Sequence, residues 1–414
     1  MCRRSLWIIN HYAVPPTMPG GTRHFELAKQ LAERGWDVTL VASSFHHATR
    51  SSEVFDSKRI QVEEIDGVSF VWIPSRTRYR NNGLARVGNM LEFAWRVWRN
   101  GRSCFGGRSP QPSAIIGSSP HLLTPWAARR LASVLDARFV FEVRDLWPET
   151  FVALGRLPEH HIIVRGLRCL ERSLYRSANY IVTLLPGASR YIQHRTGSNA
   201  QIIWIPNGAD LSSHLSEKPS RNKNKLEVVY VGAHGRANVL DDLIQAAALL
   251  KMDEKPTIHI TLVGEGPEKE HLQSMATEMG LLNVEFKAGI PKEYVPTVLE
   301  NADVAVALLE DSRLYDYGIS LNKLFDYMAS GTPILFAGRV DHDYVALAGC
   351  GLSISPRSPE AIAEGLRTFA RMQMADLRSM GAAGRTYIKI HHTWDHLANQ
   401  LGDTLEALCD DSRE

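Results

Sequence analysis

A stretch in the second half of the chain combines residues suited to binding a nucleoside diphosphate. It runs from Tyr315 to Phe336, and its apolar residues recur at helical spacing, which predicts a helix with one buried face. Lys323 and Asp326 fall on the other face, after a small and flexible loop, Tyr317–Ser320. A helix N-terminus with a lysine suits phosphates, and a carboxylate one turn later suits the hydroxyls of a ribose. The alternative is an ordinary amphipathic helix with a solvated polar face.

Three glycine-containing loops follow predicted strands, where the backbone can approach a phosphate or a sugar closely. The first contains Gly20, Gly21, Thr22 and Arg23, the second runs from Gly232 to Arg236, and the third contains Gly264, Glu265 and Gly266. None completes a G-x-G-x-x-G or a G-x-x-x-x-G-K-[ST] motif, which disfavours a dinucleotide-dependent dehydrogenase and a P-loop NTPase. A single loop of this kind is more often a tight turn than a site. Three of them at strand ends in both halves of the chain favour a ligand cleft.

A polar cluster also follows a predicted buried strand. Residues 142–149 include three acids, an arginine and a tryptophan. Because ligands in doubly wound sheets bind beyond the carboxyl ends of the strands, we expect Arg144, Asp145 and Glu149 to face the cleft. A surface pair between Arg144 and Asp145 that holds a loop is the alternative. His121 follows the preceding strand and is a weaker candidate, since a lone histidine is usually structural.

The segment from Arg76 to Arg108 carries eight arginines, no lysine and a single acid. Apolar and aromatic residues are interleaved with these charges. The pattern predicts a basic amphipathic helix lying in a membrane interface. The residues expected to contact the membrane are Trp95, Arg96, Trp98 and Arg99. Two alternatives stay open: an exposed helix whose tryptophans belong to the core, and a basic groove for nucleic acid.

The overall composition is that of a globular protein with little net charge. Of 414 residues, 44% are hydrophobic and 22% are charged, and the net charge of +2 gives no reason to expect a nucleic-acid partner. The five cysteines form no C-x-x-C pair, which argues for a reducing compartment without disulfides or a zinc site. The first apolar run is too short for a signal peptide, and no stretch reaches the length needed to cross a bilayer. We expect a cytoplasmic protein with peripheral membrane contact.

Predicted strands and helices alternate along the chain. Continuously apolar strands such as Leu6–Ile9 and Val38–Ala42 are typical of a parallel sheet covered on both faces. The alternation restarts with the strand Val228–Val231 after a polar connector, Ser212–Lys225. We therefore predict an α/β fold with two Rossmann-like doubly wound domains and an intervening cleft. The expected domains are residues 1–209, residues 210–384, and a helical end, residues 385–414, that packs back on the first domain.

Four segments resemble those of one enzyme family: HYAVPPTMPGGTRHFELAKQLAERGWDVTLV, VRDLWPE, IPNGAD and LNKLFDYMASGTPIL. Over nearly its whole length the sequence resembles a retaining glycosyltransferase of family 4, which has the GT-B architecture. It is most similar to the bacterial branch that builds O-antigen and capsule repeats and transfers aminodeoxy sugars. Members commonly carry a donor-binding E-x7-E motif. Here the second glutamate position is Asp326 and the first is Gly318.

The resemblance implies a UDP-linked donor of an N-acetylated aminodeoxy sugar, a lipid-linked or glycan acceptor at the cytoplasmic face of the inner membrane, and no metal. Arg236 and Lys323 would stabilise the departing diphosphate. Arg144 and Asp145 stand where many members carry His-Asp, and they are further catalytic candidates. The other implied donor residues are Gly232, Gly264, Glu265, Gly266, Ile290, Ile319, Leu321, Asn322 and Asp326. The acceptor or phosphate loop would comprise Gly20, Gly21, Thr22, Arg23, His121 and Glu149.

Two other functions stay open. A nucleotide-sugar epimerase can use a similar scaffold, although it would need no membrane helix. A non-catalytic nucleotide-sugar-binding subunit is conceivable because Gly318 replaces a carboxylate. Analysis of the products formed from the donor alone separates these functions from a transferase.

Overall fold

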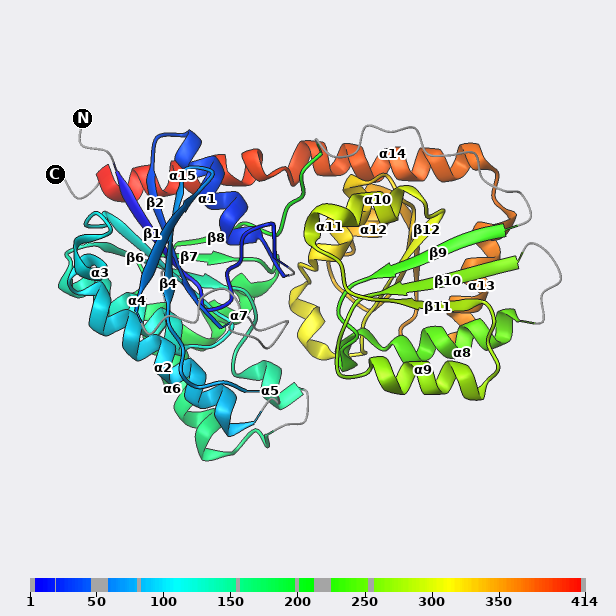
Figure 1. Ribbon diagram of the computed structural model, residues 1–414, viewed down its shortest axis with the longest axis horizontal. Coiled ribbons are helices and arrows are strands. Elements are labelled where there is room, and N and C mark those ends of the chain that lie inside the picture. The colour runs from blue at the N-terminus through cyan, green and yellow to red at the C-terminus, as the bar shows by residue number, and fades with distance from the viewer. Residues whose placement is uncertain are drawn as a thin grey trace. The chain divides into compact units, whose positions relative to one another are not determined.

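The computed structural model describes residues 4–18, 20–45, 59–79, 83–153, 157–197, 201–211, 225–251 and 257–410. The chain divides into two compact units, each of which is an α/β structure (Figure 1). The first unit comprises Met1–Pro206 and Trp394–Glu414, and the second comprises Asn207–Thr393. The predicted connector Ser212–Lys225 lies outside the described residues except for its last residue.

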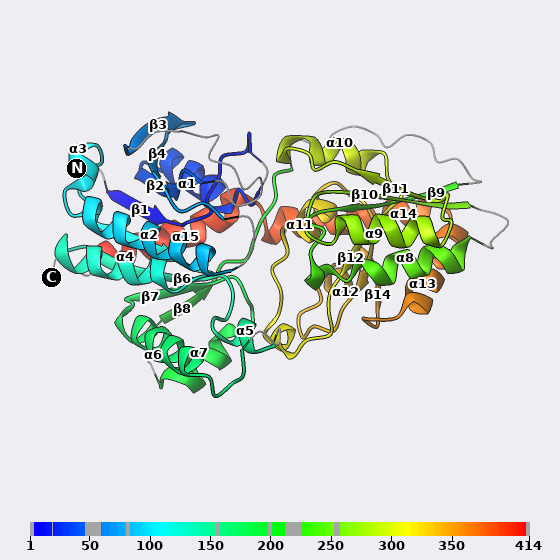
Figure 2. The ribbon, with the colours of Figure 1, turned by 60° about the horizontal axis from the view of Figure 1, so that its bottom comes forward.

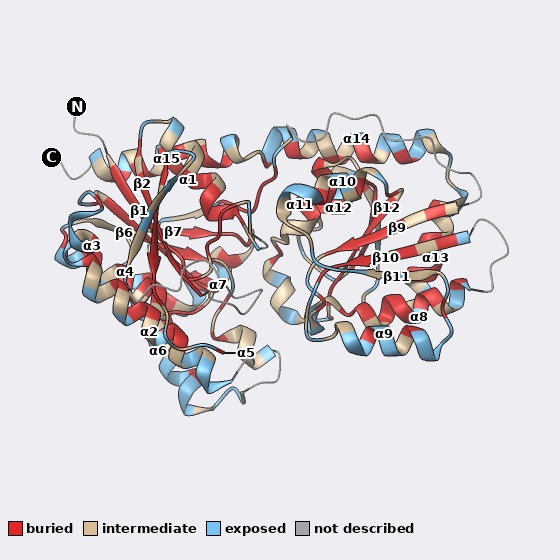
Figure 3. Ribbon diagram, in the orientation of Figure 1, coloured by how far each residue is buried: buried red, intermediate tan, exposed pale blue. Residues whose placement is uncertain are grey.

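The described part of the first unit contains an eight-stranded sheet in the order β3-β4-β2-β1-β5-β6-β7-β8. Every pairing is parallel except that of β3 with β4. The strands are β1 (Ser5–Ile9), β2 (Asp37–Ser43), β3 (Gln61–Ile65), β4 (Val68–Ile73), β5 (Ala114–Ser118), β6 (Arg138–Val143), β7 (Tyr180–Thr183) and β8 (Gln201–Trp204). The central strands β1 and β5 are buried along their whole length (Figure 3), as their continuous apolar sequences predict.

Helices cover both faces of this sheet. They are α1 (Arg23–Glu33), α2 (Leu84–Gly101), α3 (Cys104–Gly107), α4 (Leu123–Val134), α5 (Glu149–Ala153), α6 (Ile162–Ser177), α7 (Ala188–Thr196) and α15 (Trp394–Asp410). α1 packs against α15 on one face, and α2 packs against α4 on the other (Figure 2). The last helix is held by Arg34, whose guanidinium donates to the main-chain oxygen of Asn399 at 2.9 Å.

The second unit is built in the same way around a six-stranded, fully parallel sheet, as far as the described residues extend. Its strand order is β11-β10-β9-β12-β13-β14. The strands are β9 (Lys225–Val231), β10 (Thr257–Val263), β11 (Val284–Lys287), β12 (Val304–Leu308), β13 (Ile334–Ala337) and β14 (Gly351–Ile354). The helices are α8 (Leu240–Leu250), α9 (Lys269–Glu278), α10 (Val295–Glu300), α11 (Asn322–Ala329), α12 (Tyr344–Ala348), α13 (Pro359–Arg371) and α14 (Met374–His391).

In this unit α8 and α9 cover one face of the sheet, while α10 and α11 cover the other (Figure 1). Tyr327 anchors α11 to the sheet, because its hydroxyl donates to the main-chain oxygen of Val231 at 3.0 Å and accepts from the same residue's N–H at 2.9 Å. At the start of α11, Lys323 donates to the hydroxyl of Tyr230, so the first turn of the helix also contacts the end of β9. The predicted two-unit α/β fold is therefore confirmed. The predicted division at residue 384 falls inside α14, whereas the units divide between Thr393 and Trp394.

None of the described helices is long and apolar enough to cross a membrane.

Candidate functional site

The loop before α11 is shaped by a glycine. Gly318 has φ +91°, a conformation that side chains rarely adopt, so a glutamate at this position would be strained. Ile319 is buried behind the loop, and Leu321 occupies the N-cap position in an extended conformation without a side-chain cap. Asn322 begins the helix and is half-buried. The uncapped first turn leaves backbone N–H groups that can hold an anion.

Lys323 projects from the first turn of α11 into a neutral environment. Its ammonium donates to the hydroxyl of Tyr230 at 2.9 Å and to Oδ1 of Asn238 at 2.6 Å, and it lies 4.5 Å from the centre of the Tyr230 ring. Burial lowers the pKa of Lys323 to about 7. Because neither hydrogen-bond partner carries a charge, an anionic ligand would meet a cation that no carboxylate has neutralised.

Asp326 lies one turn further along α11 and forms an ion pair with Lys292. Lys292 begins a short 3-10 helix after β11, and its side chain is 30% exposed, compared with 16% for Asp326. Ile290 lies two residues earlier and packs against the same core as α11. The structure thus brings the predicted ribose and base residues to one edge of the sheet, and it adds a cation beside the carboxylate.

The loops after β9, β10 and β11 are joined to one another through their glycines. A Cβ added at Gly264 would lie 1.9 Å from the carbonyl oxygen of Gly232, and one at Gly266 would lie 2.3 Å from that of His234. These glycines are therefore required by the close approach of two backbones. Exposed Glu265 accepts hydrogen bonds from Lys269 at 2.8 Å and from the N–H of Gly289 at 3.1 Å. The second of these bonds joins the loop after β11 to the loop after β10.

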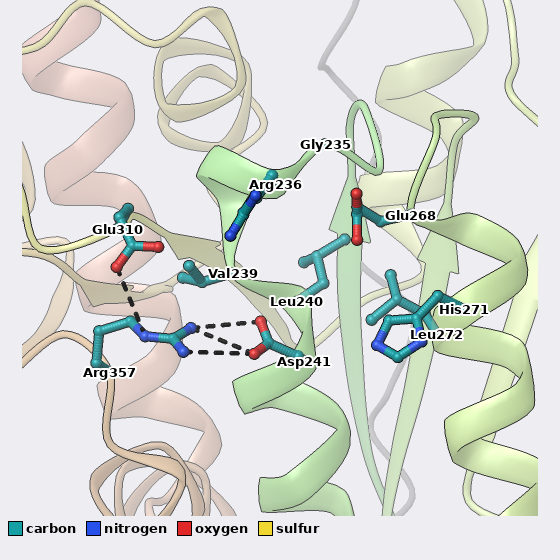
Figure 4. Close-up of a pocket in the computed structure, with 10 residues that line it drawn as sticks. All are labelled: Gly235, Arg236, Val239, Leu240, Asp241, Glu268, His271, Leu272, Glu310 and Arg357. Carbon is teal, nitrogen blue, oxygen red and sulfur yellow. Dashed lines mark hydrogen bonds and ion pairs between the residues drawn. The ribbon is translucent and has the colours of Figure 1, made fainter. Parts of the chain in front are cut away.

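Arg236 lies apart from the contacts that hold Lys323. It is exposed and lines a pocket of about 190 Å³ together with Asp241, Glu310 and Arg357 (Figure 4). The residue of this segment that contacts Lys323 is instead Asn238, two positions later. In the same pocket Arg357 is bound by Asp241 at 3.4 Å. The expectation that Arg236 and Lys323 act on one diphosphate therefore stays a prediction. The other lining residues are Gly235, Val239, Leu240, Glu268, His271 and Leu272.

In the first unit, Arg23 lies in a buried network of hydrogen bonds. Its guanidinium is 1% exposed and is bound by Glu142 at 2.9 Å and by the main-chain oxygens of Ile205, at 2.8 Å, and Pro206. The expected contact of Arg23 with a phosphate stays a prediction. Of the preceding loop residues, Gly20 is exposed, Gly21 is half-buried and Thr22 is buried.

Glu142 is the centre of this buried network. It also accepts from His24 at 2.6 Å and from the hydroxyl of Ser118 at 2.5 Å. Burial opposes its ionisation, but His24, Arg23 and Ser118 outweigh burial and hold the pKa of Glu142 well below its usual range. The network therefore ties the carboxyl ends of β5 and β6 to the start of α1 through one buried ionised carboxylate.

The remaining acceptor-side candidates differ in accessibility. His121 is buried against His11, with 2.8 Å between ring nitrogens, and its pKa is lowered to about 3 by burial and by the charge of Arg86. Asp145 is exposed, and Arg144 is half-buried, with its main-chain N–H bound to Ser119. Of the two, Asp145 is better placed to meet a ligand.

Glu149 is held by other side chains. It forms ion pairs with Arg168 at 2.9 Å and with Arg195 at 2.6 Å, which join α5 to α6 and α7. The expected place of Glu149 in the acceptor site stays a prediction.

α2 presents an exposed apolar stripe to solvent. Leu84, Val87, Leu91 and Trp95 recur every three or four residues and are all exposed, while the residues between them bury the opposite face. The guanidinium of Arg99 lies 5.5 Å from the ring centre of Trp95. Two of the residues predicted to contact a membrane, Arg96 and Trp98, are half-buried and so less exposed than Trp95. Arg96 also forms an ion pair with Glu92 at 2.8 Å. Residues 80–82 of the predicted basic segment lie outside the described residues.

Sequence reasoning missed Lys292, Tyr230, Asn238 and Asn207. Lys292 and Asp326 are 34 residues apart, and no motif connects them. Asn207 had a signal, since it belongs to the IPNGAD segment, but its contact is with a residue 113 positions away. Among the described residues, no three histidine, cysteine, aspartate or glutamate side chains gather as metal ligands.

Two family models match consecutive parts of the chain. One, described as a glycosyl transferase 4-like domain, matches residues 20–208, and one described as glycosyl transferases group 1 matches residues 213–387. Among curated proteins, the chain is 24% identical to the putative colanic acid biosynthesis glycosyl transferase WcaI of Escherichia coli K12, over 83% of this chain and 86% of the relative. It is 23% identical to the probable glycosyltransferase WbjE of Pseudomonas aeruginosa, over 77% and 78% of the two chains.

Solved structures share the fold at low sequence identity. Sucrose-phosphate synthase from Thermosynechococcus elongatus matches with a TM-score of 0.76 at 17% identity, covering 98% of this chain and 99% of the other. WaaG, a glycosyltransferase involved in lipopolysaccharide biosynthesis, matches with a TM-score of 0.68 at 16% identity, over 97% and 99%. HepE of Anabaena, solved with UDP and glucose, matches with a TM-score of 0.67 at 13% identity, over 98% and 100%.

Proposed function

The chain is a glycosyltransferase with the GT-B fold, and we propose that it is a retaining member of family 4 that moves a sugar from UDP to a lipid-linked or glycan acceptor. The transferred sugar is an N-acetylated aminodeoxy sugar, and the product belongs to a surface polysaccharide. The similarity to WcaI, described as a putative colanic acid biosynthesis glycosyl transferase, and to HepE, solved with UDP and glucose, supports this proposal.

One observation carries the donor assignment. Lys323 and Asp326 lie on successive turns at the start of α11, behind an uncapped loop, where the first offers a cation and the second a carboxylate. A nucleoside diphosphate needs both groups at about this separation, since its phosphates and its ribose hydroxyls are adjacent. The N–H groups of the first turn complete the phosphate site.

The chemistry follows from where charge develops. As the bond between the sugar and the diphosphate breaks, negative charge grows on the leaving oxygen. Protonated Lys323 and the helix N-terminus stabilise that charge in the transition state more than in the bound donor. Arg236 is the second proposed cation, and Arg144 and Asp145 are the proposed acceptor-side groups. In this mechanism the diphosphate is neutralised by protein groups and needs no metal.

The proposed acceptor binds to the first unit, which also carries the membrane-facing helix. The stripe of Leu84, Leu91 and Trp95 is exposed, and nearby arginines would attract anionic headgroups. α2 is the next element after β4 along the chain. Its N-terminus therefore lies toward the edge of the sheet at which the parallel strands have their carboxyl ends. The proposed location is thus the cytoplasmic face of the inner membrane.

Product analysis tests the function. The full chain is incubated with a panel of UDP-sugars, with and without lipid-linked sugar acceptors, and the products are separated by mass and by anomeric configuration. Acceptor-dependent release of UDP with retention supports the proposal. An altered nucleotide sugar formed without acceptor would indicate an epimerase, and binding without any product would indicate a non-catalytic subunit.

A further inference from the structure

Asn207 makes two hydrogen bonds to one residue of the loop before α11. Its main-chain N–H donates to Oγ of Ser320 at 2.8 Å, and its side-chain Nδ2 donates to the carbonyl oxygen of Ser320 at 2.5 Å. Asn207 is 2% exposed, and its Oδ1 is buried without a hydrogen-bond partner. Asn207 thus donates once from its main chain and once from its side chain to the same loop residue, which fixes the hydroxyl and the carbonyl group of Ser320 together.

The position of Ser320 gives these bonds their importance. Ser320 directly precedes Leu321, which is the N-cap of α11. It comes two residues after Gly318, whose φ of +91° lies in a region that favours glycine. Lys323 is held by Tyr230 and Asn238, and Asp326 is held by Lys292. At the start of the loop, the N–H of Gly318 donates to the carbonyl oxygen of Tyr315 at 2.9 Å. Two residues later, Ser320 is held from outside the loop by Asn207.

The chain just before Asn207 is itself held. Arg23 donates to the main-chain oxygens of Ile205 and Pro206, and Glu142 in turn holds Arg23. Within the second unit, the N–H of Ala209 donates to the carbonyl oxygen of His392 at 3.0 Å. The chain is therefore hydrogen-bonded on both sides of Asn207.

We propose that Asn207 is a positioning residue that aims the loop of residues 318–321 at the donor diphosphate. This inference rests on the proposed function, because it assigns a role within the same donor site. Asn207 does not touch the donor. It acts through Ser320, whose orientation decides whether the loop N–H groups point at the phosphates.

The test compares the binding of UDP and of inorganic pyrophosphate by calorimetry, using the full chain. Asn207→Ala removes the side-chain bond to the loop, and we expect it to weaken both ligands by about tenfold, the effect of one such bond. Ser320→Ala, which removes the acceptor of the Asn207 N–H, should act in the same direction. Ser320→Thr retains the hydroxyl acceptor and should bind both ligands as the wild type does.

Three results would overturn the inference. They are UDP binding by Asn207→Ala within twofold of the wild type, loss of UDP binding with pyrophosphate binding intact, and an unchanged affinity of Ser320→Ala if Asn207→Ala fails to fold. A purely structural role would lower the unfolding temperature of Asn207→Ala and leave both affinities unchanged at temperatures where the variant is folded. If the wild-type chain binds neither ligand, it is the proposed function that fails.

Discussion

The carboxylate of Asp326 forms an ion pair with the ammonium of Lys292, which lies in the loop that follows β11. Both side chains remain partly exposed, so the carboxylate keeps an edge that a ligand can reach. In the proposed donor site, Asp326 is one methylene shorter than glutamate, and Lys292 contacts its Oδ2; we propose that Oδ1 is the oxygen that binds the ribose. We regard the pair as the feature that adapts an aspartate to this position.

We predict that Asp326→Ala weakens UDP binding by at least tenfold, because it removes charged hydrogen bonds to ribose worth about 1.5–3 kcal/mol each. Calorimetry with UDP and with 2′-deoxy-UDP measures the effect, which should be smaller for the deoxy nucleotide. Asp376→Ala, at an exposed site in α14, is the matched control. Equal affinities of the wild type and Asp326→Ala for UDP would remove Asp326 from the site.

Lys292→Met should produce a milder form of the same defect. Without the ammonium, the Asp326 side chain loses its fixed orientation but keeps its charge. We expect UDP affinity to fall by a few fold and pyrophosphate affinity to stay unchanged, since Lys292 faces the carboxylate. A larger loss for pyrophosphate than for UDP would show that Lys292 serves the phosphates instead.

Much of the fold could be predicted from the sequence, because buried parallel strands are continuously apolar. The strands predicted at Leu6–Ile9 and Val38–Ala42 are β1 (Ser5–Ile9) and β2 (Asp37–Ser43), each within one residue of the predicted limits. β3 was missed because it is an edge strand that alternates between half-buried and exposed residues and carries two glutamates. Its antiparallel pairing is decided by contact with β4 rather than by its own hydrophobicity.

The site was only partly predictable, for a different reason. Lys323 and Asp326 belong to one helix, so their spacing could be read directly. Arg23 was placed in the acceptor or phosphate loop, and nothing in that stretch indicated its ion pair with Glu142, which is 119 residues away. Contacts of this kind are set by tertiary packing and leave no local pattern in one sequence.

The pH dependence of UDP binding should report on Lys323. Its pKa of about 7 means that the free protein loses this positive charge as the pH rises above 7, so binding at pH 8 must take up a proton. We predict an affinity that falls between pH 7 and pH 9, and proton uptake measured by calorimetry in two buffers of different ionisation enthalpy. Lys323→Arg, which stays charged, should abolish the uptake. Uptake that persists in Lys323→Arg would assign the proton to another group.

Turnover gives a second test of Lys323. Lys323→Met should lower kcat more than it raises KM, because the cation acts mainly on charge that develops in the transition state. Arg236→Ala should have a smaller effect in the same direction, since Arg236 is exposed and lines a separate pocket. An effect of Lys323→Met on KM alone would make Lys323 a binding residue.

We predict that the buried carboxyl group of Glu171 makes the stability of the folded protein depend on pH. It is buried and accepts hydrogen bonds from Tyr175 at 3.1 Å and Tyr191 at 3.0 Å, and burial raises its pKa from 4.5 to about 7. The folded state therefore holds a proton that the unfolded state loses between pH 4.5 and pH 7, so stability falls as pH rises through this window. Glu171→Gln should lack this loss and be more stable than the wild type at pH 8, by about 1–3 kcal/mol.

Urea unfolding at pH 5 and pH 8 measures this difference. Glu33→Gln, at an exposed site on α1, is the control and should follow the wild type at both pH values. A Glu171→Gln variant that is less stable than the wild type at pH 8 would contradict the assignment.

Membrane binding is predicted to be reversible and sensitive to salt. Each arginine near an anionic surface contributes about 1 kcal/mol to the binding free energy at low salt. The apolar stripe of α2 would insert into the headgroup region and add to this. Replacing Leu91, Trp95 and Arg99 by glutamine should abolish sedimentation with anionic vesicles and leave UDP binding intact. The control variant replaces Leu282, which is exposed in the second unit. Equal binding to neutral and anionic vesicles, or none to either, would refute the membrane assignment.

The most direct test of the central claim is a crystal structure of the full chain with UDP. We predict that the diphosphate lies within hydrogen-bonding distance of Lys323 Nζ and of the N–H groups at the start of α11, with the ribose against Asp326. UDP bound elsewhere, for example in the pocket between Arg236 and Arg357, with α11 left unoccupied, would contradict the account.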